Sequence, residues 1–184
     1  MATPVPTELV EAARTGGRDE IELLLSTVWP DAYRLARAVL AEDQPAEDAA
    51  QEACIVVYRT IASLRSSGAF RTWFYRIVVR EAAELKRRRS RTEPAPEPSS
   101  SAYDQTAPID VWRALSALSH KLREVVVLRY FEDLSSPEIA SVLGIPEGTV
   151  RFRLMIAKQR LRPQLGDYSE SFSHASGEAR TNAI

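Results

Sequence analysis

The sequence of 184 residues contains one cysteine and two histidines, so it has few of the side chains that form disulfides or bind metals. A single cysteine, Cys54, excludes an intrachain disulfide and a cysteine-rich zinc site. His120 and His174 are far apart in the sequence and have no partners of ligand type. Glycine-rich phosphate loops, nucleophile elbows and zinc-binding patterns are also absent. We therefore expect no catalytic residues, no cofactor and no metal ion.

Long apolar runs are missing as well. No apolar stretch approaches the roughly 18 residues that predict a transmembrane helix. The N-terminus lacks the charged and then apolar pattern of a signal peptide. We therefore expect a soluble, cytoplasmic protein that does not insert into a membrane.

The net charge is only −1, but the charges are unevenly distributed. Residues 1–60 hold eleven acids against five bases, a balance of −6, whereas residues 71–91 hold eight bases against two acids, a balance of +6. An acidic first third and a basic middle suggest two different partners, one of them a nucleic acid.

Strand patterns are scarce and the long segments have helical periodicity, which predicts an all-α fold. Residues 93–107, EPAPEPSSSAYDQTA, contain three prolines, three serines and three acids. Such a segment cannot form a core, so we predict a flexible, acidic linker there. It would join two small helical domains, residues 7–92 and 108–165, and residues 166–184 are predicted to form a disordered polar tail.

A helix-turn-helix pattern occupies residues 135–162, SSPEIASVLGIPEGTVRFRLMIAKQRLR. We predict a first helix that ends at Leu143, with Ser136 as N-cap and Pro137 as its first residue. Gly144 follows where the chain needs a positive φ. A second helix should start near Thr149, with an apolar stripe at Val150, Leu154, Ala157 and Leu161.

The second helix of this pattern is cationic, with no acid between its first and last basic residue: Arg151, Arg153, Lys158, Arg160 and Arg162. Such a helix commonly lies in the DNA major groove. The alternative is a plain helical hairpin with a solvated charged face. The cap, the glycine and the one-signed charge together favour DNA binding.

The acidic first third is predicted to form helices over Glu8–Arg14, Arg18–Val28, Asp31–Leu40 and Pro45–Leu64. The last of these has an alanine-rich face, on which Cys54 acts as a small buried hydrophobe. The opposite face carries Asp48, Gln51, Glu52, Ile55 and Tyr58. Two isolated apolar residues within a polar face are typical of a protein–protein interface. A solvated face explains the pattern equally well.

The basic middle is predicted to be a long helix over Ala69–Arg89. One stripe, beginning with Phe70, is apolar. The opposite stripe places an exposed Trp73 in line with Arg76, Arg80 and Arg87, and the basic run that includes Arg88 follows. Cations neutralise phosphates and an aromatic ring stacks on bases, so this stripe suits a DNA strand. The alternative places Trp73 in the core and leaves the arginines solvated.

Two blocks of the sequence together resemble a known family. PAEDAAQEA and FRTWFYRIVVREAAELKRRR resemble region 2 of the bacterial sigma factors, and LREVVVLRYFEDLSSPEIASVLGIPEGTVRFRLMIAKQRLR resembles their region 4. The chain length and the short connection are similar to those of the extracytoplasmic-function group. The resemblance implies a promoter-specificity subunit of RNA polymerase, often inhibited by an anti-sigma factor.

The resemblance also implies roles for the residues. Region 2 would bind the clamp helices of the largest polymerase subunit through Asp48, Gln51, Glu52, Ile55 and Tyr58. It would open and hold the −10 element through Phe70, Trp73, Arg76, Arg80, Arg87 and Arg88. Region 4 would meet the flap of the second-largest subunit and bind the −35 element through Ser136, Thr149, Arg151, Phe152, Arg153, Met155, Ile156 and Lys158.

Some positions depart from the family pattern. An aromatic residue is usual at Cys54 and a tryptophan at Tyr58, and the residues Arg80 and Glu84 replace a common Asn and Asp. Small or basic residues are usual at Phe152 and Ile156. With Met155 they form an apolar outward patch, which either meets a T-rich −35 element, follows DNA shape, or binds a protein.

Two other classes of function remain open at this point. The chain could be a stand-alone helix-turn-helix regulator whose first 91 residues dimerise or sense a signal. It could also be a nuclease that binds a metal through Asp48 and Glu52, although no histidine or second acidic pair lies nearby.

Overall fold

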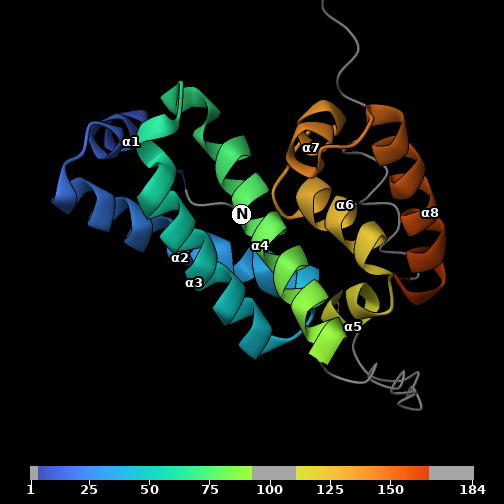
Figure 1. Ribbon diagram of the computed structural model, residues 1–184. Helices are drawn as coiled ribbons and strands as arrows, with labels where there is room; N and C mark the ends of the chain where they lie inside the picture. Colours follow the sequence, from blue (N-terminus) through green and yellow to red (C-terminus); the bar gives the residue numbers. More distant parts are fainter. Residues whose placement is uncertain (1–3, 93–110, 166–184) are drawn as a thin grey trace, which may run out of the picture.

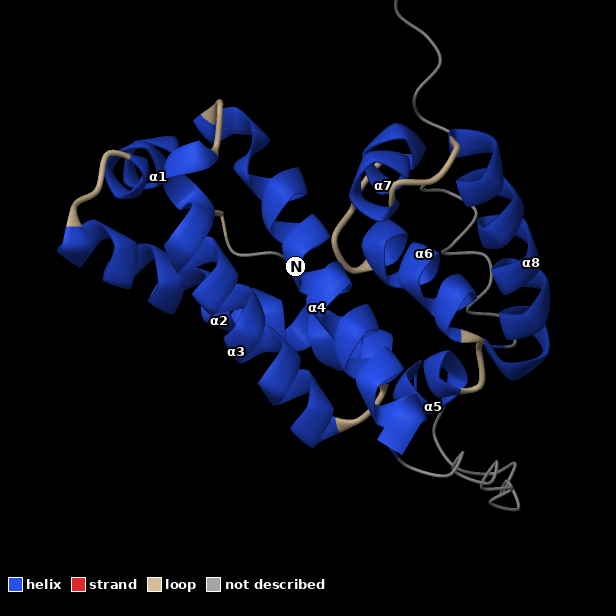
Figure 2. Ribbon diagram, in the orientation of Figure 1, coloured by secondary structure: helices blue, strands red, loops and turns tan. Residues whose placement is uncertain are grey.

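The computed structural model describes residues 4–92 and 111–165. These residues form eight α-helices and two short 3-10 helices, and none of them lies in a strand (Figure 2). The all-α prediction is therefore confirmed. The predicted linker at 93–107, the predicted domain start at Pro108 and the predicted tail at 166–184 lie outside the described residues.

The N-terminal domain contains α1 (Thr7–Arg14), α2 (Arg18–Leu40), α3 (Asp43–Thr60) and α4 (Phe70–Thr92). Two 3-10 turns, Ile61–Ser63 and Ser67–Ala69, lead from α3 into α4. Helices α2 and α3 form an antiparallel hairpin, and α4 packs against both (Figure 1). The small side chains that α3 turns inward, among them Ala46, Ala50 and Ala53, are fully buried. They let the helix backbones approach closely.

Helix α2 continues through Pro30, where the sequence predicted a break between two helices. An interior proline removes one backbone hydrogen bond and costs about 3 kcal/mol. Here Pro30 and the Ser26 carbonyl one turn earlier are on the exposed side, so water can reach that carbonyl. Leu24, Val28 and Leu35 are buried on the other side, before and after the proline. Tertiary packing on both sides of Pro30 therefore holds α2 as a single helix.

The C-terminal domain contains α5 (Val111–Ser116), α6 (His120–Tyr130), α7 (Ser136–Leu143) and α8 (Glu147–Leu165). Helix α6 lies in the middle of this half (Figure 1). All seven residues from Leu122 to Leu128 are buried. This follows because α6 contacts α7 and α8 on one side and α2 of the other domain on the other side.

The two domains pack directly against each other. Helix α4 contacts α7, and α2 contacts α6, so the buried side chains of both halves form one continuous core (Figure 1). Arg123 of α6 strengthens the contact: its Nη1 donates to the Val39 carbonyl near the end of α2 at 2.9 Å. The same guanidinium donates to three carbonyls at the end of α5: Leu115, Ser116 and Leu118.

Candidate nucleic-acid and protein interfaces

The predicted helix-turn-helix is formed by α7 and α8. Its N-cap is Ser135, so the prediction of Ser136 is wrong by one residue, and Pro137 is the second helical residue. Ser135 and Glu138 make a reciprocal capping box: the Glu138 amide donates to Ser135 Oγ, and the Ser135 amide donates to Glu138 Oε2 at 2.8 Å. The side-chain and backbone hydrogen bonds from Ser135 lower the pKa of Glu138.

The turn between α7 and α8 depends on Gly144, whose φ of 64° lies in the left-handed region, as predicted. Its N–H donates to the Ala140 carbonyl and closes the helix. The chain then turns at Ile145 and Pro146, and the Thr149 amide donates to the Pro146 carbonyl at 2.9 Å. Helix α8 accordingly begins at Glu147, two residues earlier than the apolar spacing predicted.

The apolar stripe of α8 faces the domain core. Val150 and Ala157 are fully buried, Leu161 is 7% exposed and Leu154 is half-buried. The outward side chains of α8 are Arg151, Phe152, Met155, Lys158, Gln159, Arg160 and Arg162, while Thr149, Arg153 and Ile156 are partly exposed. The same helix therefore combines a packed apolar face with an exposed face rich in cations.

Large apolar side chains are rarely exposed in the described part of the chain. The four with high exposed fractions are Phe152 at 61%, Leu23 at 57%, Tyr58 at 55% and Met155 at 47%. Three of these four are residues that the sequence placed at interfaces. Leu23, on α2, was not predicted, because it stands directly before Leu24 and Leu25, which the helical spacing places in the core, and no pattern distinguishes it from them.

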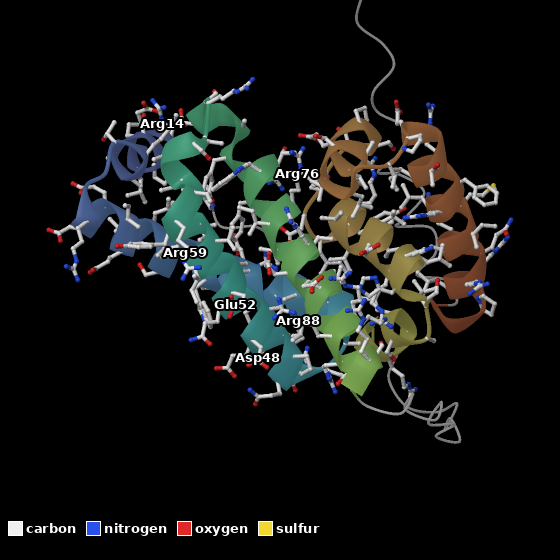
Figure 3. The ribbon with its side chains drawn as sticks, in the orientation of Figure 1. Arg14, Asp48, Glu52, Arg59, Arg76 and Arg88 are labelled. Carbon is white, nitrogen blue, oxygen red and sulfur yellow. The ribbon has the colours of Figure 1, made fainter. Side chains whose placement is uncertain are left out.

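The predicted acidic face lies on α3. Asp48, Gln51 and Glu52 are exposed, and Asp48 and Glu52 lie along the same side of α3 as Arg59 (Figure 3). Tyr58, six residues after Glu52, is exposed, and Ile55 between them is half-buried. Cys54 is half-buried, and burial raises the pKa of its thiol to about 11, so it is a poor nucleophile.

The aromatic start of α4 is less exposed than the sequence predicted. Phe70 is only 4% exposed and stacks on Phe74 with ring centroids 5.7 Å apart. Trp73 is half-buried and packs against the core, with its ring centroid 6.0 Å from that of Phe70. Trp73 is therefore only partly exposed where the sequence predicted an exposed ring, because the ring packs against Phe70 and the core.

Arg76 and Arg80 of α4 are exposed, and both lie beside the C-terminal domain. Arg76 lies at the boundary between α4 and α7 (Figure 3), and it donates to the Ser141 carbonyl at 3.1 Å and to Ser141 Oγ at 2.8 Å. Arg80 and Arg153 line a groove of about 620 Å³ between α4 and the helix-turn-helix. The structure thus brings together cations that the sequence assigned to two different DNA elements.

The last turns of α4 carry the remaining predicted cations. Arg87 and Arg88 pair with the Glu84 carboxylate at 2.6 Å and 3.2 Å. Hydrogen bonds from these two arginines lower the pKa of Glu84, so the carboxylate stays ionised. Arg88 lies on the side of α4 that is visible together with Asp48 and Glu52 of α3 (Figure 3).

A buried polar cluster lies between the domains, and no pattern in the sequence predicts it. Glu132, which follows α6, has no exposed surface and accepts hydrogen bonds from the Tyr75 hydroxyl and from Arg34 Nη2, the latter at 3.2 Å. Arg71 donates to the Glu132 carbonyl. Arg34 also pairs with Asp31 at 3.0 Å. Burial and the Glu132 carboxylate raise the pKa of Tyr75, so its hydroxyl remains a donor.

Within residues 4–92 and 111–165, His, Cys, Asp and Glu side chains do not gather in groups of three or more that could hold a metal ion. Each helix in these two segments is also too short or too polar to cross a membrane.

Comparison with known families matches both halves of the chain. The family described as Sigma-70 region 2 matches residues 24–92, which include α3 and α4. The family described as Sigma-70, region 4 matches residues 109–161, which include the helix-turn-helix. The two matches follow each other along the chain in the order expected from the sequence.

Curated proteins similar to this chain include the ECF RNA polymerase sigma factor SigM of Mycobacterium tuberculosis, 33% identical over 86% of this chain and 84% of SigM. RNA polymerase sigma factor SigV of Bacillus subtilis is 30% identical over 73% of this chain and 84% of SigV. The ECF RNA polymerase sigma factor SigE of Mycolicibacterium smegmatis is 32% identical over 78% of this chain. The match spans 61% of the length of SigE.

Two solved structures share the fold across both domains. CnrH, in complex with the cytosolic domain of CnrY, aligns with a TM-score of 0.66 at 24% identity over 88% of this chain and 97% of CnrH. The sigma factor RpoE of Bartonella quintana, in complex with the anti-sigma factor NepR, aligns with a TM-score of 0.64 at 23% identity over 78% of this chain and 95% of RpoE.

Proposed function

Because the chain belongs to the sigma-70 family, in its extracytoplasmic-function group, we propose that it directs core RNA polymerase to specific promoters and assists promoter opening without catalysing a reaction itself. The observation that carries this proposal is the exposed cationic face of α8, which a capped turn and a buried apolar stripe hold in place. A stand-alone regulator is not favoured, since the family match extends over α3 and α4 as well.

Helix α8 would lie in the major groove of the −35 element, as the second helix of a helix-turn-helix does. Its base-facing and phosphate-facing residues would be Thr149, Arg151, Phe152, Arg153, Met155, Ile156 and Lys158. Ser136, partly exposed in the first turn of α7, is close to the positive end of that helix and would donate to a phosphate.

Helix α4 would hold the −10 element. Its exposed cations, Arg76, Arg80, Arg87 and Arg88, would neutralise phosphates of the opened strand. The partly exposed ring of Trp73 would meet a base by stacking. Phe70 is buried beneath Trp73 and would support that ring from below.

The acidic face of α3 would bind core polymerase. Asp48, Gln51 and Glu52 would pair with a basic partner surface such as the clamp helices of the largest subunit. Tyr58, exposed at 55%, and the neighbouring Ile55 would supply the apolar anchors. The flap of the second-largest subunit would meet the C-terminal domain.

The packed arrangement of the two domains would have to open on the promoter. The −10 and −35 elements are about 25 base pairs apart, which is about 85 Å at 3.4 Å per base pair. A domain of about 150 residues has a radius of gyration near 15 Å. The two packed domains therefore cannot reach both elements, and the bonds from Arg76 to Ser141 must break before Arg76 can meet DNA.

An anti-sigma factor is the partner that would hold the domains closed. RpoE of Bartonella quintana was solved with the anti-sigma factor NepR, and this chain shares its fold over both domains. A partner that binds only the packed arrangement would stabilise it relative to the open arrangement by the free energy of binding. The population of the packed arrangement would therefore rise.

Reconstitution with core RNA polymerase tests the proposal. The chain should co-purify with core polymerase, and run-off transcription from its promoters should need both components. Duplex DNA binding by the chain alone, with no affinity for core polymerase, would contradict a sigma function and point to a stand-alone regulator.

A further inference from the structure

Buried, exposed uncharged and cationic side chains of α8 occupy separate bands around the helix axis. With about 100° per residue and Arg151 as origin, the buried side chains fall at about 240–280°: Val150, Ala157 and Leu161. The middle of the opposite face, at about 40–140°, carries Met155, Gln159, Phe152 and Ile156. The two edges are cationic, with Lys158, Arg151 and Arg162 at about −20° to 20°, and Arg160 and Arg153 at about 180–200°.

This order matches the cross-section of a major groove. The groove is about 12 Å wide, its two walls are lined by phosphates, and its floor presents base edges. Cations on both edges of a helix meet both walls, and the middle band meets the floor. A protein partner would need acidic side chains on both sides of an apolar ridge, whereas every major groove offers phosphates on both sides of its base edges.

The middle band offers no arginine or lysine that could donate to the O6 and N7 atoms of guanine. Phe152 and Met155 are 61% and 47% exposed, so they can reach the groove floor. Apolar side chains there contact the C5-methyl group of thymine, and a glutamine donates to and accepts from adenine. Gln159 is exposed in the same band, two turns after Phe152.

We propose that α8 recognises A·T base pairs in the −35 element, with Phe152 and Met155 on thymine methyl groups and Gln159 on adenine. G·C pairs at these positions are disfavoured. Phe152 and Gln159 are about 10 Å apart along the helix at 1.5 Å per residue, so the readout covers about three base pairs. The inference rests on the proposed function and specifies what its −35 contact recognises.

The first experiment is a selection with the holoenzyme, formed from this chain and core polymerase. Promoter fragments with randomised −35 and −10 regions are selected for open-complex formation and sequenced. Enrichment of A·T pairs in the −35 region is expected. Enrichment of G·C pairs there, with a defined −10 element, overturns this inference and leaves the proposed function standing. Absence of any enriched sequence in both regions overturns both.

The second experiment removes single methyl groups. Each thymine of the selected −35 element is replaced by uracil, which lacks only the C5-methyl, and holoenzyme binding is measured. Loss of a methyl group that the protein contacts should lower the affinity about fourfold, which corresponds to the burial of one CH₂ group. Phe152→Ala should lower affinity for the thymine promoter and remove the difference between thymine and uracil at one position. Equal affinity of wild-type holoenzyme for both promoters overturns the inference.

Lys158→Ala is the matched control. Lys158 lies on a cationic edge of the same helix, so its loss should weaken binding to the thymine and uracil promoters by the same factor. A thymine–uracil difference that disappears in this variant as well would mean that the methyl effect reflects DNA shape and not contact with Phe152.

Discussion

Replacing Glu132 with alanine tests the polar cluster that joins the two domains. The Glu132 side chain has no exposed surface and accepts from Tyr75 and Arg34. Removing the carboxylate leaves a buried tyrosine hydroxyl without its acceptor, which costs about 1–3 kcal/mol. The substitution also removes one of the two carboxylates that pair with Arg34. Removing one partner of a buried ion pair costs about 3–5 kcal/mol, which includes the loss of its hydrogen bonds. Asp31 still pairs with Arg34, so we expect a loss near the lower end, about 3 kcal/mol.

The assay is urea unfolding followed by circular dichroism, together with small-angle X-ray scattering of the native protein. Glu132→Ala should lower the free energy of unfolding by about 3 kcal/mol or split the transition in two as the domains separate and the radius of gyration rises. Glu22→Ala is the matched control, because its pair with Arg18 is exposed and worth at most about 0.5 kcal/mol. A single transition with an unchanged midpoint and an unchanged radius would refute the role assigned to Glu132.

Three further predictions concern the interfaces. Asp48→Lys should weaken binding to core polymerase about tenfold or more, since a positive charge would face a basic partner. Glu8→Lys, on α1, is the control. Equal affinities of the Asp48→Lys variant and the wild type for core polymerase, measured in a pull-down titration, would remove the α3 face from the interface. Arg151→Ala should weaken promoter binding at all sequences alike and reduce the salt slope by about one; a loss confined to one base pair would show base recognition instead. Ser135→Ala should cost about 1 kcal/mol at pH 7. Ser135 lowers the pKa of Glu138 below its ordinary 4.5, so the part of this cost that comes from the bond between Ser135 Oγ and the Glu138 carboxylate is complete above that pH and is lost as the pH falls through the lowered value. A cost that stays constant on acidification would contradict the capping box.

The helix-turn-helix could be predicted from the sequence because its signals are local. The N-cap serine, Gly144 and the apolar spacing from Val150 to Leu161 each act within a few residues, and the structure places them as expected apart from the shift of the N-cap to Ser135 and the earlier start of α8 at Glu147. The helical periodicity of the α3 sequence was also enough to predict its acidic face, because that face is exposed.

The contacts between the domains could not be predicted in this way. Glu132 meets Arg34, 98 residues away, and no periodic pattern marks such a pair. Helix α4 contacts α2 and α3 on one side and α7 on the other, and Trp73 is half-buried where the stripe opposite the apolar one predicted exposure. Pro30 likewise marked a helix boundary locally, whereas packing on both sides of it keeps α2 continuous.

Footprinting on promoter DNA tests directly whether the chain acts as a sigma factor. Promoter DNA is probed with DNase I for protection and with permanganate for unpaired thymines, in the presence of this chain, core RNA polymerase, or both. A sigma factor with two DNA-binding domains predicts unpaired thymines at the −10 element and protection at the −35 element, and both should require the two components together. Protection by the chain alone, with no unpaired thymines when core polymerase is added, would contradict a sigma function.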